Sequence, residues 1–221
     1  MGMTGPVIHI VDDDDGLREA VSRLLGALGF ELREHDSVGS FLLAQTTDQG
    51  GCVLLDVCMP GPSGLDLQLA LSRRGSSLPI IFLTGNGDIP MSSLAMKRGA
   101  VDFLTKPVDK EQLLAAIGTA LRQDADARNT RQARMEITRR YHSLTPREKT
   151  VFAQVVSGKL NKQIADVLGT CERTVKTHRA NVMDKMQARS VAELVHLAVA
   201  LGTDREFEGP QPMHVPGQAA A

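Results

Sequence analysis

The chain has 221 residues, of which 42% are hydrophobic and 23% are charged, and its formal net charge is −1. This length exceeds what one compact domain needs and allows two domains with cores of their own. The composition excludes a disordered chain, and no apolar run reaches the roughly 18 residues of a membrane span. The N-terminus lacks the basic and apolar regions of a secretion signal. We therefore expect a globular cytoplasmic protein with no membrane contact and with free thiols, because the spacing of its cysteines fits neither a disulfide framework nor a zinc site.

The charge is distributed unevenly along the chain. Residues 1–121 contain 9 Lys and Arg against 15 Asp and Glu, a net charge of −6. The net charge is +3 over residues 122–142, +4 over residues 143–202 and −2 over residues 203–221. An acidic first part suits the binding of cations, and a basic later part suits the approach to a polyanion.

Short apolar runs alternate with helical patterns over the first half of the chain. Between the first two strands, apolar residues from Leu17 to Leu28 recur at helical spacing, and Gly29 provides the stop. This alternation predicts an α/β fold, a doubly wound five-stranded parallel sheet with helices on both faces. The expected strands are Val7–Val11, Glu31–His35, Cys52–Leu55, Pro79–Leu83 and Asp102–Leu104, and the further helices are Val38–Gln45, Gly64–Arg74, Pro90–Arg98 and Asp109–Arg122.

Polar residues stand at the carboxyl ends of these strands, where open parallel sheets bind their ligands. Four aspartates follow the first strand, Asp56 closes the third, Thr84 closes the fourth and Lys106 follows the fifth. Two unit charges about 4 Å apart repel by roughly 4 kcal/mol at an effective dielectric constant of about 20, and a divalent cation relieves that cost. Mg²⁺ takes carboxylates, waters and phosphate oxygens, while a hydroxyl and an ammonium suit the other oxygens of a phosphoryl group. The sequence thus predicts a cation and phosphoryl site at this edge.

Four motifs carry a resemblance to the receiver domain of two-component response regulators, which has a flavodoxin-like fold. They are "VDDDD", "LLDVCMPGPSG", "LTGNGD" and "FLTKP", in that order at successive strand ends, and the similar region covers residues 5–122. The resemblance implies that Asp56 accepts a phosphoryl group from a sensor histidine kinase. It implies that Mg²⁺, or Mn²⁺, is held by Asp12, Asp13, Asp56 and the main-chain oxygen of Cys58, a position where the family commonly has a larger side chain.

The same resemblance assigns roles to residues on the last two strands. Thr84 bonds the phosphoryl group, Lys106 pairs with it, and a cis peptide precedes Pro107. Phe103 is expected to be the switch aromatic that turns inward when Thr84 moves, with a plain core residue as the alternative. The remaining aspartates of the opening run, Asp14 and Asp15, are interpreted as acids at the start of a helix, where the helix macrodipole favours them.

A second domain is predicted to begin near residue 143. Thr145, Pro146 and Glu148 form a capping-box start to a helix that ends at Gly158. A short helix over Asn161–Leu168, a turn at Gly169 and a longer helix over residues 171–186 give the helix-turn-helix arrangement. A final helix is expected from Ser190 to Leu201, where an apolar stripe serves as core or as a dimer surface.

The longer of these two helices carries cations and small polar groups on its outer face, which suits entry into the major groove of DNA. The stretch from "LTPRE" to "AELV" resembles the LuxR-type DNA-binding domain, and receiver plus LuxR-type domain is the layout of the FixJ/NarL group. Cys171 stands where family members often have serine at the helix start, and cysteine caps poorly. The resemblance implies base contacts by Lys176, Thr177 and Ala180, and base or phosphate contacts by Arg173, Arg179 and Asn181.

These readings give a domain plan of receiver 1–122, helical linker 123–142, LuxR-type domain 143–202 and disordered tail 203–221. Residues 122–142 contain neither Gly nor Pro, which favours a helix, with a disordered linker as the alternative. The tail is rich in proline and ends in an alanine run.

The expected function is that of a response regulator in which phosphorylation of Asp56 controls homodimerisation and binding to double-stranded promoter DNA, with RNA polymerase as a further partner. No enzyme activity is expected beyond self-catalysed phosphorylation and dephosphorylation. In an alternative regulation, the unmodified receiver masks the DNA-binding face. Two other classes of protein stay open, a phosphotransfer enzyme with an aspartyl intermediate and a DNA-binding adaptor that does not depend on phosphorylation.

Overall fold

The computed structural model describes residues 5–44, 49–85 and 89–202, so the tail expected at 203–221 lies outside the described residues. The chain divides into two compact units between Asn129 and Thr130, and each unit is described by itself. Within the described residues, no helix has both the length and the apolar character to cross a membrane.

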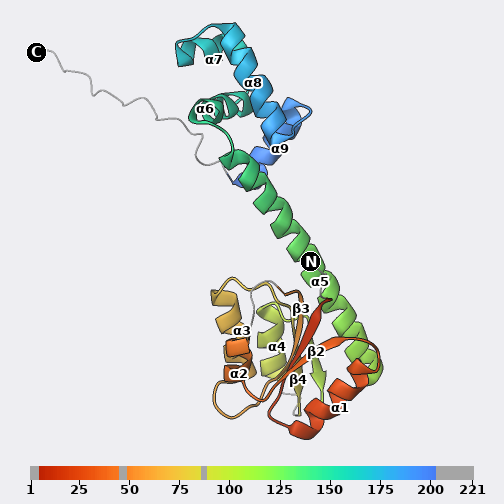
Figure 1. The fold of residues 1–221 in the computed structure, drawn as a ribbon. Coiled ribbons are helices and arrows are strands. Elements are labelled where there is room, and N and C mark those ends of the chain that lie inside the picture. The colour runs from red at the N-terminus through yellow and green to blue at the C-terminus, as the bar shows by residue number, and fades with distance from the viewer. Residues whose placement is uncertain (1–4, 45–48, 86–88, 203–221) are drawn as a thin grey trace, which may run out of the picture. The chain divides into compact units, whose positions relative to one another are not determined.

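The first unit is built on a five-stranded parallel sheet in the order β2-β1-β3-β4-β5 (Figure 1). Every residue of the three central strands, β1, β3 and β4, is buried. That burial explains why these strands read as continuous apolar runs and not as alternating patterns. The predicted fold class is confirmed, and the strands are β1 (Val7–Val11), β2 (Glu31–His35), β3 (Gly51–Asp56), β4 (Ile80–Thr84) and β5 (Asp102–Thr105).

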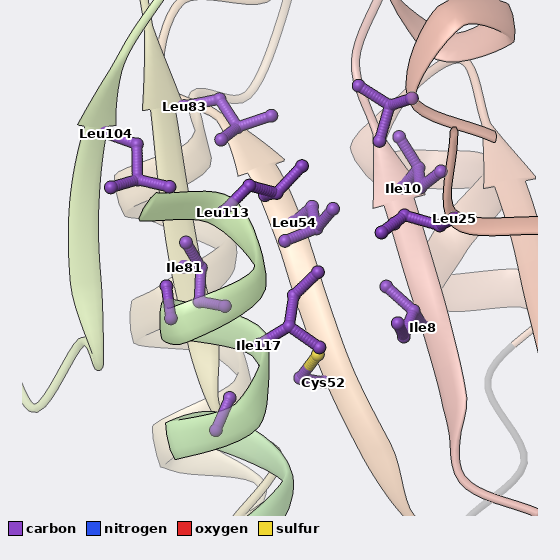
Figure 2. Close-up of a cluster of buried hydrophobic side chains, with 13 residues drawn as sticks. Ile8, Ile10, Leu25, Cys52, Leu54, Ile81, Leu83, Leu104, Leu113 and Ile117 are labelled. Carbon is purple, nitrogen blue, oxygen red and sulfur yellow. The ribbon is translucent and has the colours of Figure 1, made fainter. Parts of the chain in front are cut away.

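Helices cover both faces of this sheet. Successive side chains of a strand point to opposite faces, so the apolar strands present side chains that must be covered on each side. On one face, Ile8, Ile10 and Leu54 pack against Leu25 of α1 and Ile117 of α5 (Figure 2). On the other face, alternate residues of the same strands pack against α2, α3 and α4. The helices are α1 (Asp15–Gly26), α2 (Val38–Ala44), α3 (Gly64–Arg73), α4 (Ile89–Lys97) and the first part of α5 (Lys110–His142), which extends past the unit boundary at Asn129.

One expectation for this unit needs correction. Leu28 was expected to belong to the first helix, but α1 ends at Gly26 with Ala27 as its C-cap, and Leu28 is 48% exposed. Gly29 lies beyond that end with a φ of 85°, a conformation that glycine adopts without steric cost. The segment 123–142, expected to be a helical linker, is helical and continues the helix expected over Asp109–Arg122 as α5.

Within the described residues of the second unit, the four helices that follow α5 pack around one apolar core. Phe152 of α6, Ile164 of α7 and Val175 of α8 are completely buried in that core, together with Leu194 of α9. Gly169, with a φ of 60°, ends α7 and allows the tight turn into α8, so the helix-turn-helix arrangement is present. The helices are α6 (Pro146–Val156), α7 (Asn161–Leu168), α8 (Glu172–Met186) and α9 (Val191–Leu201).

The start of α6 is tied to α8 by a buried carboxylate. Thr145 caps α6, and the Glu148 carboxylate bonds back to the Thr145 amide at 2.8 Å, which is the expected capping box. The same carboxylate accepts a hydrogen bond from the Lys185 Nζ at 2.6 Å. That bond, followed by the contacts with Thr145, lowers the pKa of Glu148 to about 2 against an opposing effect of burial. Glu148 therefore fixes the position of α8 relative to the first helix of the unit.

Candidate functional site

The carboxylates predicted to bind a cation lie together at the carboxyl edge of the sheet. Asp12 follows β1 and is completely buried, Asp13 beside it is exposed, and Asp56 at the end of β3 is only 5% exposed. One oxygen of each carboxylate lies within 4.8 Å of those of the other two. Sheet pairing produces this arrangement, since β1 and β3 are parallel neighbours with Val11 opposite Leu55.

Lys106 lies between two of these carboxylates. Its Nζ is 2.7 Å from Asp12 Oδ2 and 3.0 Å from Asp56 Oδ2, and its main-chain amide donates to the Thr84 carbonyl at 2.6 Å. Burial lowers the pKa of Lys106, but the hydrogen bonds and charges of the two aspartates outweigh burial and raise it above its ordinary value. Burial also raises the pKa of Asp12, against the opposing hydrogen bond from Lys106. The ammonium thus compensates two gathered negative charges.

Asp56 is held close to the main chain that follows it. Its Oδ1 accepts a hydrogen bond from the Cys58 amide at 3.3 Å. The Val57 carbonyl accepts from the Gly64 amide at 3.2 Å, which brings the start of α3 against this turn. A Cβ at Gly64 would lie 2.3 Å from the Asp56 carbonyl oxygen, so only glycine fits. The Cys58 side chain itself is exposed beside the site.

The two residues expected to act as a switch lie on neighbouring strands. Thr84 ends β4, is 1% exposed and pairs in register with Thr105 of β5. Phe103 is half-buried, and its ring centroid lies 6.0 Å from that of Phe82. The Lys106–Pro107 peptide is cis, as the resemblance implies.

The donor set of this site fits a hard divalent cation. It offers carboxylate oxygens alone, two on buried residues and one on the exposed Asp13, so part of the coordination sphere faces solvent. That combination suits Mg²⁺, which prefers oxygen ligands and retains several waters. Asp12, Asp13 and Asp56 are the residues that would hold the ion, and the Cys58 main-chain oxygen stays a predicted fourth ligand.

Asp14 and Asp15 have roles in the start of α1. Asp14 is the N-cap, and its carboxylate accepts from the Leu17 amide at 3.1 Å. Asp15 is the first helical residue and pairs with Arg18. Arg18 was not singled out from the sequence, although its side chain also reaches the Asp12 main-chain oxygen. Its place three residues after Asp15 on a predicted helix is the signal from which the contact with Asp15 could have been predicted.

The outer face of α8 carries most of the predicted DNA contacts. Arg179 is half-buried, and its Nη1 donates to Asn161 Oδ1 at 3.0 Å. That bond joins α8 to the start of α7 and gives Arg179 a structural role in the described unit. Cys171 is the N-cap of α8, and its side chain makes no capping hydrogen bond. The exposed members of the predicted set are Arg173, Lys176, Thr177, Ala180 and Asn181.

Together, the acidic edge of the parallel sheet and the exposed basic helix of the second unit define a class of protein, a receiver joined to a helix-turn-helix DNA-binding domain. Residues 8–118 match the response regulator receiver domain, and residues 142–198 match the bacterial regulatory proteins of the luxR family. The chain belongs to the response regulators of the FixJ/NarL group. It is a DNA-binding transcriptional regulator and not a conventional enzyme.

Individual relatives match over nearly the whole chain. The transcriptional regulatory protein FixJ of Azorhizobium caulinodans is 43% identical over 195 residues, which cover 88% of this chain and 92% of that protein. The tetrathionate response regulatory protein TtrR of Salmonella typhimurium is 44% identical over 188 residues, which cover 85% of this chain and 89% of that protein. A solved structure of the response regulator StyR has a TM-score of 0.81 at 43% identity and covers 89% of this chain and 99% of its own. A receiver domain implies a histidine kinase as partner, and a LuxR-type domain implies promoter DNA.

Proposed function

We propose that this protein accepts a phosphoryl group on Asp56 from a histidine kinase and that this modification controls dimerisation and promoter binding. The observation that carries the proposal is the gathering of the Asp12, Asp13 and Asp56 carboxylates within 4.8 Å, with Lys106 bonded to two of them. An acidic cluster that would hold a divalent cation, together with one bridging ammonium, is the arrangement needed to bring an anionic phosphoryl group to a carboxylate nucleophile.

In the proposed reaction, a carboxylate oxygen of Asp56 attacks the phosphorus of the kinase phosphohistidine. The new P–O bond forms as the P–N bond breaks, and the imidazole leaves with the electron pair. A bound Mg²⁺ or Mn²⁺ would neutralise charge on the phosphoryl oxygens. Lys106 pairs with one of those oxygens and Thr84 donates to another. In this assignment, Phe103 turns inward when Thr84 moves towards the phosphoryl group.

The output of the proposed switch is the second unit. Lys176, Thr177 and Ala180 contact base edges from α8 in the major groove, while Arg173, Arg179 and Asn181 contact bases or phosphates. Two units in a dimer bind paired half-sites, so one binding event raises the effective concentration for the other. RNA polymerase is the further partner through which a promoter-bound cytoplasmic regulator acts.

The phosphoacceptor is tested by intact-mass measurement of the full chain after treatment with acetyl phosphate in MgCl₂. Wild type should gain the mass of one phosphoryl group, and the gain should disappear with hydroxylamine, which cleaves acyl phosphates. The Asp56→Asn variant should gain nothing, because an amide is not a nucleophile under these conditions. The matched control, Glu19→Gln, removes an exposed carboxylate of α1 and should react like wild type. Labelling of Asp56→Asn at the wild-type level would refute the assignment.

A further inference from the structure

Arg18 makes two contacts that join the start of α1 to the end of β1. Its side chain is only 12% exposed. Its Nη1 donates to the main-chain oxygen of Asp12 at 2.6 Å, and its Nη2 pairs with the carboxylate of Asp15, which is 84% exposed. A planar guanidinium presents two donors at a fixed separation, so it can hold both partners in one geometry.

The contact with Arg18 uses the main chain of Asp12 and not its carboxylate. The Asp12 carboxylate accepts from the Asp14 amide at 3.0 Å and from Lys106 at 2.7 Å. Its main-chain amide donates to the His35 carbonyl at 3.2 Å. Arg18 engages the remaining main-chain oxygen. It therefore restrains the backbone between Asp12 and Asp14 without using a carboxylate oxygen that a cation needs.

We propose that Arg18 is a positioning residue for the divalent-cation site, which it serves by fixing the turn that presents Asp12 and Asp13 to Asp56. This inference rests on the proposed function, because it concerns the cation that supports phosphorylation of Asp56. Arg18 itself touches neither the cation nor the phosphoryl group. Its effect is transmitted through the main-chain oxygen of Asp12 and through the anchor at Asp15.

The sign of the effect separates positioning from simple electrostatics. Arg18 places a positive charge beside the acidic cluster, and a positive charge alone repels a divalent cation. Removal of the charge would then tighten Mg²⁺ binding. If Arg18 orders the turn, its removal weakens Mg²⁺ binding, because part of the binding free energy is then used to order the ligands. Loss of a group that orients metal ligands typically costs 10-fold to 100-fold in metal affinity.

The test is a titration of the full chain with MgCl₂, followed by the NMR shifts of the Asp13 and Cys58 amides. Arg18→Met removes the charge and the fork, whereas Arg18→Lys retains the charge and loses the fork. Arg23→Met removes an exposed cation from the same helix and is the matched control. Spectral dispersion of amides far from the turn reports whether each variant is folded. If Arg18→Met does not fold, Arg18→Lys still tests the proposal.

We expect a Mg²⁺ dissociation constant roughly 10-fold higher in Arg18→Met, a smaller increase in Arg18→Lys and no change in Arg23→Met. A Mg²⁺ dissociation constant in Arg18→Met that equals the wild-type value or lies below it overturns the positioning role and leaves the proposed function standing. If wild type shows no Mg²⁺ shifts, the proposed function fails and this inference fails with it.

Discussion

Gly64 shows at the scale of one residue how the site constrains the sequence around it. It is the first residue of α3, and its amide donates to the carbonyl of Val57, directly after β3, the strand that ends at Asp56. Added atoms at this position meet the Asp56 carbonyl oxygen and the side chains of Leu55 and Phe82. The position is therefore restricted by packing around the main chain of Asp56.

The first prediction concerns this glycine. Gly64→Ala should lower the free energy of unfolding by about 1 to 3 kcal/mol, because the new methyl group forces the turn after Asp56 to shift. The matched control is Gly26→Ala in α1, where a Cβ would meet only Leu32 at 3.8 Å. That change should stabilise the protein by up to about 1 kcal/mol, since alanine favours a helix over glycine. Urea unfolding curves of both variants check this, and equal stability of the two would contradict it.

A pair of buried histidines links two neighbouring strands and a helix. His9 of β1 and His35 of β2 are 5% and 6% exposed, with His9 Nδ1 3.0 Å from His35 Nε2. Both rings pack edge-on against Phe41 of α2, at centroid distances of 5.2 and 5.3 Å. Burial, followed by the charges of His35 and Arg33, lowers the pKa of His9 from 6.5 to about 4. Burial also lowers the pKa of His35.

The second prediction follows from the direction of these pKa shifts. As the pH falls from 6.5 towards 4, the unfolded chain binds a proton at His9 and the folded chain does not, so stability is lost with acid. We expect the protonation of His9 in the unfolded chain to lower the free energy of unfolding by about 2 kcal/mol between about pH 7.5 and about pH 5. His35 should lower it further. Urea unfolding at the two pH values measures this loss. The double variant His9→Leu with His35→Leu should lose most of the dependence, and a dependence as steep as that of wild type would contradict the assignment.

The third prediction concerns the uncapped start of α8. The Cys171 side chain makes no capping hydrogen bond, so the change Cys171→Ser adds an acceptor for an amide of the first turn. We expect the free energy of unfolding of the second unit to rise by about 1 kcal/mol. Thermal unfolding checks this against Cys58→Ser, which alters an exposed cysteine outside any helix cap. A stabilisation of equal size in Cys58→Ser would show that capping is not the cause.

At the scale of the whole molecule, much of the architecture could be predicted because local patterns determine it. The runs that read as continuous apolar segments are the central strands, and the acids at their carboxyl ends meet because parallel strands place those ends at one edge. Thr145 and Glu148 were recognisable as a capping box because both members lie within one turn. Neighbours along the chain carry enough information for such features.

Contacts between distant residues could not be predicted in the same way. His9 and His35 lie 26 residues apart, and their pairing depends on strand register and on the helix that covers it. Arg179 donates to Asn161, 18 residues away, because the turn at Gly169 brings α7 and α8 together.

The central claim is that modification of Asp56 alters the behaviour of the second domain. The most direct measurement is the sedimentation coefficient and promoter affinity of the full chain in MgCl₂, before and after acetyl phosphate, with Asp56→Asn as control. Salt is held constant, because contacts with DNA phosphates make the affinity salt-dependent. We predict that phosphorylated wild type becomes dimeric and binds DNA at least about 10-fold more tightly, while Asp56→Asn is unchanged. Stoichiometric phosphorylation of Asp56 with no change in either property would contradict this account.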